Sequence, residues 1–264
     1  MQIVGELINT SRGAVHTAVD NLDAAFIQGL AAKQVEAGAD YVDVNAGTFV
    51  GKEGDKLCWL VETVQARVET PLALDTPDPE ALRRALAVHR GRPLINSITG
   101  ETGRWETMLP VVAEAKAAVI ALCLDDAGMP QSAADRLRVA GKLVRGLEGA
   151  GVSMEDIYLD PLVCPVSTDT SAALAALEAI GAMRREFPGV HAICGLSNVS
   201  YGLPKRRLLN NAFCLLAMQQ GLDAVLLDPL DRSLISLIQA TQTLLGKDEY
   251  CMAYIQAVRE NRLT

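Results

Sequence analysis

Four carboxylate or carboxamide side chains stand at the ends of short apolar runs that lie far apart in the sequence. They are Asp75 in LALD, Asn96 in LINS, Asp160 in IYLD and Asn198 in GLSNVS. A carboxylate can accept two parallel hydrogen bonds from a flat group with neighbouring N–H donors, and a carboxamide both donates and accepts. If the fold brings these side chains together, they form a polar pocket suited to a planar nitrogen heterocycle.

The edge of a pterin ring is a flat group of this kind, because a ring N–H lies beside an exocyclic amino group. One carboxylate can pair with both donors in a fork, while a second carboxylate and a carboxamide satisfy the remaining ring atoms. Each side chain taken singly has another interpretation, since Asp and Asn after a strand also cap helices and form turns. The pterin interpretation therefore depends on the whole set.

Short β-rich runs alternate with helical segments from one end of the chain to the other. Eight runs are predicted to be strands: Gln2–Gly5, Tyr41–Val44, Leu72–Asp75, Leu94–Ser97, Ala118–Cys123, Ile157–Asp160, His191–Gly195 and Ala224–Leu227. Several are nearly continuous apolar runs, as is typical of parallel strands covered on both faces. Eight strand–helix units predict an α/β fold, a single (β/α)8 TIM barrel with a parallel eight-stranded core. The carboxyl ends of the strands in such a barrel share one mouth.

The length of the chain favours one domain, because 264 residues are close to the roughly 250 of a typical barrel. We expect residues 1–264 to form that domain, with helices over Ser132–Gly149 and Thr168–Phe187. A further short helix is expected from about residue 249. An open, doubly wound sheet remains the alternative topology.

Composition and charge exclude some classes of partner. The formal net charge is −8 and the longest basic run is Lys205–Arg207, which leaves no basic face to neutralise nucleic-acid phosphates. No apolar run approaches the roughly 20 residues of a membrane span, so we expect a cytoplasmic protein that does not enter a membrane. The six cysteines lack CxxC spacing, which argues against a disulfide framework.

The short sequence motifs around these polar residues resemble those of one family, the methyltetrahydrofolate:corrinoid protein methyltransferases. That family has pterin-binding barrels related to dihydropteroate synthase. The matching segments are GELIN (5–9), DVNAG (43–47), LDT (74–76), INS (95–97), LDPL (159–162) and GLSNVS (195–200). Arg206 and Asn210 fall where the family has R-x3-N after the seventh strand. The resemblance runs from the first strand into the eighth, and GLSNVS is its most specific element.

The resemblance implies a role for each matching residue. It implies that Asp75, Asn96 and Asp160 hold the pterin of tetrahydrofolate or methyltetrahydrofolate as substrate, and that Arg206 belongs to the same binding set. Asn198 is implied to be the catalytic residue, beside the N5 atom that carries the methyl group. Supporting positions with less specific roles are Glu6, Asn9, Asp43 and Ser197.

An asparagine beside N5 is chemically reasonable. A tertiary amine is a poor leaving group, so N5 must gain positive charge before a nucleophile removes its methyl group. The amide oxygen of Asn198 can accept a hydrogen bond from protonated N5, and that interaction strengthens as the charge forms. The resemblance further implies that the nucleophile is cob(I)alamin, and that the methyl group can also move in the opposite direction.

The partners expected from the resemblance are a corrinoid protein and a second copy of the chain. The sequence lacks the cobalamin-binding motif D-x-H-x-x-G, so the cobalamin must be carried by a separate protein. Standalone barrels of this family type look dimeric, and two-fold homodimers are the commonest soluble oligomers. We expect no nucleic-acid partner.

Three alternatives remain open. A dihydropteroate synthase-like enzyme would carry a TPDSF-type first loop and a later G-x-SRK segment, whereas the first loop here reads NTSRG (9–13). A zinc-dependent corrinoid methyltransferase would use Cys123, Cys164 and Cys194, which lie near three strand ends but are also typical buried apolar residues. We expect no protein-bound metal. A folate-binding subunit without activity is the third alternative, although none of the four polar residues is lost.

Overall fold

The computed structural model describes residues 1–264 and contains one sheet of eight parallel strands. The strands are β1 (Gln2–Asn9), β2 (Tyr41–Asn45), β3 (Leu72–Asp75), β4 (Leu94–Gly100), β5 (Ala118–Asp125), β6 (Ile157–Asp160), β7 (His191–Ala192) and β8 (Ala224–Leu227). Hydrogen bonds join them in the order β7-β6-β5-β4-β3-β2-β1-β8. Gly195, just after β7, pairs with Leu226 of β8 and closes the circle. The predicted (β/α)8 barrel is confirmed, and the open-sheet alternative is wrong.

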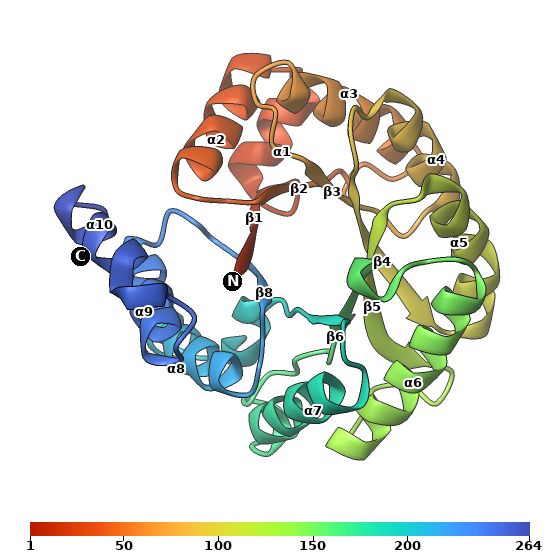
Figure 1. Ribbon diagram of the computed structural model, residues 1–264. Coiled ribbons are helices and arrows are strands. Elements are labelled where there is room, and N and C mark those ends of the chain that lie inside the picture. The colour runs from red at the N-terminus through yellow and green to blue at the C-terminus, as the bar shows by residue number, and fades with distance from the viewer.

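Ten α-helices accompany the strands, and Figure 1 shows them as an outer ring around the barrel. They are α1 (Gly13–Asp20), α2 (Ala24–Glu36), α3 (Glu53–Gln65), α4 (Pro79–Val88), α5 (Thr102–Ala115), α6 (Ala133–Gly149), α7 (Ala172–Glu186), α8 (Arg206–Gln219), α9 (Arg232–Leu244) and α10 (Met252–Arg259). The last helix, α10, projects beyond the ring beside α9 (Figure 1). None of the helices combines the length and apolar character needed to cross a membrane.

Local sequence signals explain where several helices begin. Ser132 and Asp135 form a capping box, in which the Asp135 N–H donates to Ser132 Oγ and the Ser132 N–H donates to the Asp135 carboxylate. The expected helix from Thr168 starts later, at Ala172. Asp169 accepts hydrogen bonds from the N–H and hydroxyl of Ser171, so these polar residues form a turn before the helix rather than its cap.

The strands differ from expectation mainly at their carboxyl ends. β1 continues to Asn9 across an irregularity in its pairing with β2 between Gly5 and Ile8. Gln34 of α2 fits against this irregularity and accepts a hydrogen bond from the Leu7 N–H at 3.0 Å. A Cβ at Gly5 would lie 2.5 Å from the Gln34 side-chain oxygen, so the close approach requires glycine.

The inside of the barrel is filled by an apolar layer. Its members come from β1, β3, β4, β5, β6 and β8 and from the residue after β7: Val4, Ala73, Leu94, Ala118, Ile120, Tyr158, Ile193 and Ala224, with Tyr41 of β2 packed against them. Because strand side chains alternate, the residues two positions further along also point inward, one layer nearer the carboxyl ends. On β1, β2, β3, β4 and β6 those residues are polar, which places the candidate site directly above a solid apolar floor.

Candidate functional site

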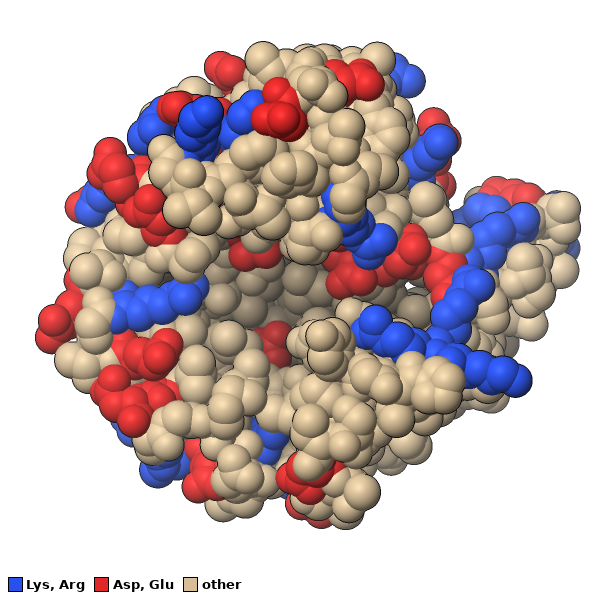
Figure 2. Space-filling model, turned by 180° about the vertical axis from the view of Figure 1, so that it is seen from behind, with Lys and Arg blue, Asp and Glu red and all other residues tan.

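Five strands contribute a polar side chain to the layer above the apolar floor. These are Glu6 of β1, Asp43 of β2, Asp75 of β3, Asn96 of β4 and Asp160 of β6. Figure 2 shows the molecule from behind, where the face is hollowed at its centre and acidic side chains lie within and around the hollow. The fold therefore gathers most of the polar residues singled out in the sequence at one mouth.

Two amide–carboxylate pairs organise one side of this mouth. Asn96 donates from Nδ2 to Asp43 Oδ1 at 3.0 Å, and Asn45 donates from Nδ2 to Asp75 Oδ2 at 2.9 Å. Because the Asn96 amide nitrogen is engaged by Asp43, its carbonyl oxygen remains free to accept a hydrogen bond from a ligand. Asp43 thus fixes the orientation of the Asn96 amide. Asn45 was not chosen from the sequence, although it lies inside the matching DVNAG segment.

Burial raises the pKa values of the carboxyl groups in these pairs. The pKa of Asp75 is raised to about 6, chiefly by burial. The pKa of Asp43 is raised well above its ordinary value by burial and by the neighbouring Asp75 carboxyl. Two carboxyl groups close together in a poorly solvated site disfavour double ionisation. The mouth consequently favours a ligand that brings hydrogen-bond donors or positive charge.

Asp160 lies on the opposite side of the mouth at the end of β6. It is 8% exposed, and its Oδ1 accepts a hydrogen bond from the Leu162 N–H at 2.7 Å. Burial raises its pKa to about 7, against the lowering effect of the Leu162 and Gly195 N–H groups and of Arg136. A carboxyl with this pKa changes charge near neutrality, so its ligand interactions depend on pH.

Arg136 of α6 supports the segment that follows Asp160 and was not singled out in the sequence. The side chain is 1% exposed. It donates from Nε to the Pro161 carbonyl at 2.7 Å and from Nη1 to the Ser132 carbonyl at 3.1 Å. The guanidinium thereby fixes the loop that follows β6, directly after Asp160. Only tertiary contacts identify this role.

Asn198 occupies a separate position, on the short 3-10 turn Leu196–Ser200 that follows β7. Its side chain is exposed, and its Nδ2 lies 3.1 Å from the place where a Cβ on Gly195 would be. The segment expected to be strand up to Gly195 leaves regular pairing after Ala192. This early end lets the chain turn and present Asn198 on the mouth side of the barrel.

The R-x3-N pair of α8 holds this turn. Arg206 donates from Nη2 to the Ser197 carbonyl at 2.6 Å and from Nε to Ser200 Oγ at 3.0 Å. The Ser200 hydroxyl, which is fully buried, donates to Asn210 Oδ1 at 2.6 Å. In the structure, Arg206 and Ser197 thus position the backbone that carries Asn198.

The remaining supporting residues have different surroundings. Glu6 and Ser197 line a cavity of about 350 Å3 between β1, β8 and the start of α8. Asn9 accepts a hydrogen bond from the Ser11 N–H at 2.9 Å and so shapes the turn after β1. Glu6 therefore faces an open volume next to the Asn198 turn, whereas Asn9 is engaged locally.

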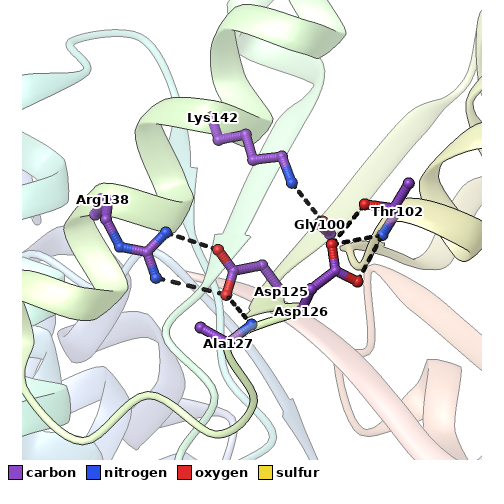
Figure 3. Close-up of polar contacts among 7 residues, drawn as sticks. All are labelled: Gly100, Thr102, Asp125, Asp126, Ala127, Arg138 and Lys142. Carbon is purple, nitrogen blue, oxygen red and sulfur yellow. Dashed lines mark hydrogen bonds and ion pairs between the residues drawn. The ribbon is translucent and has the colours of Figure 1, made fainter.

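A second polar network fixes the loops that follow β4 and β5. Figure 3 shows Arg138 of α6 reaching Asp125, with Nη1 2.7 Å from the carboxylate. Asp126 accepts a hydrogen bond from the Thr102 N–H at 3.0 Å, and Lys142 donates to the Gly100 carbonyl at 2.7 Å (Figure 3). These contacts join the start of α5 to the end of β5 and to α6. They therefore fix the loops at the carboxyl ends of β4 and β5, next to Asn96.

The three cysteines near strand ends have different surroundings. No group of three or more His, Cys, Asp or Glu side chains is arranged to hold a metal ion. Burial raises the pKa values of Cys123 and Cys194, which disfavours their thiolate forms. Cys164 instead lies near the buried Arg136, with Sγ 3.9 Å from Nη2. The thiols occupy the barrel as small buried or partly buried groups.

Comparison with known proteins agrees with the composition of the mouth. The family model described as "Pterin binding enzyme" matches residues 5–228. The chain belongs to the pterin-binding enzyme family. A methylcorrinoid:tetrahydrofolate methyltransferase from Eubacterium limosum is 36% identical over 265 residues, which cover 100% of this chain and 98% of that protein. The family resemblance inferred from the motifs is confirmed.

Weaker similarities extend to other enzymes. A methionine synthase from Mycobacterium tuberculosis is 29% identical over 210 residues, or 75% of this chain and 18% of that protein. A dihydropteroate synthase from Xanthomonas albilineans, solved with 7,8-dihydropteroate, superposes with a TM-score of 0.67 at 22% identity, covering 91% of this chain and 93% of the other. The enzyme from Vibrio fischeri gives 0.70 at 18% identity, covering 93% of each chain. These structural similarities establish the barrel fold.

Proposed function

We propose that this protein is a methyltransferase that moves the N5-methyl group between methyltetrahydrofolate and the cobalt of a corrinoid protein, with residues 1–264 acting as one pterin-binding domain. The observation that carries the proposal is the 36% identity to a methylcorrinoid:tetrahydrofolate methyltransferase over the entire chain. The ring of carboxylates and amides at the barrel mouth supports it, because those groups match the donors of a pterin edge.

In this proposal Asp75, Asn96 and Asp160 hold the pterin. Asp160 would accept a fork of two donors, because its buried carboxyl stands at the mouth end of β6. The carbonyl of Asn96, oriented by Asp43, accepts a ring N–H from the other side. Acceptors on both sides of the mouth fix the ring plane and direct its N5 toward the turn after β7.

Asn198 would act where positive charge develops. Protonated N5 is a better leaving group than neutral N5. An amide oxygen near N5 stabilises the protonated amine more than it stabilises the neutral substrate. The contacts of Arg206 and Ser200 with the turn would preorganise that oxygen before the substrate binds. Preorganisation matters because an amide that must reorient during the reaction loses part of its effect.

The corrinoid would arrive on another protein, because the sequence contains no D-x-H-x-x-G cobalamin-binding motif. Cob(I)alamin, as the methyl acceptor, supplies an electron pair to the methyl carbon. The mouth is open on its outer side, which suits a substrate delivered by a second protein (Figure 2). The same pocket serves the opposite direction, from a methylated corrinoid to tetrahydrofolate.

The direct experiment incubates the purified protein with methyltetrahydrofolate and free cob(I)alamin. We expect the absorbance of cob(I)alamin to fall and that of methylcobalamin to rise, with one tetrahydrofolate formed per methyl group. The mixture without protein gives the background rate. A protein that binds methyltetrahydrofolate but leaves cob(I)alamin unchanged would be a folate-binding subunit, and the proposal would fail.

We also propose that the protein is a homodimer. Exposed leucines lie on the adjacent helices α7 and α8, namely Leu174 at 60% exposure, Leu208 at 68% and Leu216 at 55%. Exposed apolar side chains on neighbouring helices can pack against the same helices of a second copy in a two-fold interface. Light scattering at micromolar concentration is expected to give about twice the 28.2 kDa mass of one chain. A mass of one chain only would contradict the dimer.

A further inference from the structure

Methyl transfer from methyltetrahydrofolate consumes a proton, and the inference below rests on the proposed function. N5 must be protonated before the methyl group leaves. Without that proton, N5 would carry a negative charge after losing the methyl group, and such a nitrogen anion is a very poor leaving group. The amide of Asn198 can stabilise the protonated nitrogen but cannot supply its proton. A titratable group near the Asn198 turn is therefore required, or else the proton must come from solvent.

Glu6 has the required position. On β1 it lies two residues beyond Val4, a member of the apolar floor, so its side chain points into the barrel mouth. It lines the 350 Å3 cavity together with Ser197, the residue before Asn198. The Glu6 side chain is 25% exposed, and its one ionic contact is with Arg12 Nη2 at 3.7 Å. The cavity thus connects a nearly free carboxyl group to the Asn198 turn.

The charges around Glu6 come from four elements. Arg12 lies in the turn after β1, Asp228 follows β8, Arg206 begins α8, and Asp43 lies on β2. Burial is the largest influence and raises the pKa of Glu6; Asp228 raises it as well, while Arg12 and Arg206 lower it. Glu6 accordingly keeps a proton to higher pH than an ordinary glutamate, as a general acid working near neutrality needs.

The other carboxyl groups of the mouth are already engaged. Asp43 accepts from Asn96, and Asp75 accepts from Asn45. Asp160 accepts from the Leu162 N–H, and Asp228 accepts from the Leu230 N–H at 2.9 Å. Their orientations are set by these contacts. Glu6 accepts no hydrogen bond from the protein, so it can turn toward a ligand in the cavity.

We propose that Glu6 is a catalytic acid and base that exchanges the N5 proton, directly or through one water molecule. In transfer from methyltetrahydrofolate, the Glu6 O–H bond breaks and an N5–H bond forms. The electron pair of cob(I)alamin then forms the cobalt–methyl bond, and the electrons of the N5–methyl bond remain on N5. In the opposite direction the Glu6 carboxylate removes the proton from N5. Solvent reaching the open cavity restores Glu6 after each turnover.

The test is single-turnover transfer to cob(I)alamin with saturating methyltetrahydrofolate, measured across pH. Glu6→Gln is expected to lower the rate constant by roughly 10²–10⁴, the usual contribution of a general acid, with folate affinity within about threefold of wild type. The wild-type rate falls as pH rises through the raised pKa of Glu6, because the carboxylate form has no proton to give. In Glu6→Gln the proton must come from solvent, so the step at the pKa of Glu6 is lost and only the pH dependence of N5 protonation remains. Glu6→Asp keeps part of the rate.

Chemical rescue separates proton transfer from a structural role. In Glu6→Ala, which leaves space in the cavity, added formate is expected to restore rate in proportion to its concentration, because a small carboxylic acid replaces the missing group. The matched control is Asp228→Asn, which removes an acidic group from the same cavity. Because Asp228 raises the pKa of Glu6, its loss should move the descending step toward lower pH, while the rate below that step stays within about threefold of wild type.

The outcomes separate the two proposals. A wild-type protein without methyl transfer overturns the proposed function together with the role of Glu6. An active wild type overturns the role of Glu6 alone if Glu6→Gln keeps the full rate and pH profile, or if formate leaves the rate of Glu6→Ala unchanged. Should Glu6→Gln fold poorly, Glu6→Asp and the formate response of Glu6→Ala decide the question in the same way.

Discussion

Replacing Asn198 by alanine is expected to lower the rate of methyl transfer by roughly 10²–10³, the usual cost of removing one preorganised polar group. Folate affinity should change far less. The amide oxygen interacts most strongly with protonated N5, which resembles the transition state more than the neutral bound substrate does. A loss confined to the rate constant is therefore the signature of the proposed role.

The pH dependence of the Asn198→Ala variant supplies a second readout. Removing the amide weakens the stabilisation of protonated N5, so the pKa of the bound substrate falls. The rate of the variant should still rise as pH falls, because protonation remains necessary, but the curve should move toward lower pH. Single-turnover transfer to cob(I)alamin at saturating methyltetrahydrofolate measures both quantities.

Asn211→Ala is the matched control for Asn198→Ala. Asn211 is another asparagine, and it lines the cavity beside Glu6. Its removal should keep the rate within about threefold, because Asn211 is not directed at N5 in this proposal. If Asn198→Ala matched wild type in rate and in pH profile, the assignment of Asn198 would be lost.

The sequence was sufficient for the barrel and for the inward-facing polar residues of its strands, because both depend on short-range patterns. Alternation along a strand places Tyr158 in the apolar floor and Asp160 one layer higher, and the same logic applies to Leu94 and Asn96. Apolar runs of four to eight residues mark parallel strands, and their last polar residue marks the mouth. Positions that follow from a two-residue period can be assigned without knowing any tertiary contact.

Other features required the tertiary structure. Arg136 has the sequence environment of a solvent-facing helix residue, yet carbonyl groups of the loop after β6 bind its guanidinium. Arg206 was predicted to belong to the pterin-binding set, and only the structure shows that it also donates to the backbone of the Asn198 turn. The end of β7 at Ala192 was missed because Ile193 and Cys194 continue the apolar run. Each depends on partners distant in sequence.

Asp160→Asn is expected to reduce tetrahydrofolate affinity at least tenfold. The substitution keeps the shape of the side chain but replaces one acceptor oxygen by a donor, so the proposed fork loses an acceptor and sets two donors against each other. Leaving buried donors of the pterin unpaired costs roughly 1–3 kcal/mol for each group. Calorimetric titration with tetrahydrofolate measures the loss, and Asp169→Asn, an exposed aspartate before α7, is the control.

The same substitution should change how stability depends on pH. An unfolded aspartate ionises near its ordinary pKa of 3.8, whereas burial raises the pKa of folded Asp160 to about 7. Between these values the folded protein binds the extra proton, so the contribution of Asp160 to stability is fully present below the unfolded value and is lost as pH rises toward 7. The amide of Asp160→Asn does not titrate, so the stability of this variant does not fall with pH through that group.

Melting temperatures measured from pH 4 to 8 should therefore fall less steeply with rising pH in Asp160→Asn than in wild type. Asp43 and Asp75, whose pKa values are also raised, contribute equally to both proteins and cancel in the comparison. Weaker tetrahydrofolate binding together with a flatter stability profile would identify Asp160 as a ligand-binding carboxyl. Its burial disfavours the ionised form and so lowers the stability of the folded protein at high pH. Parallel profiles with unchanged affinity would remove Asp160 from the site.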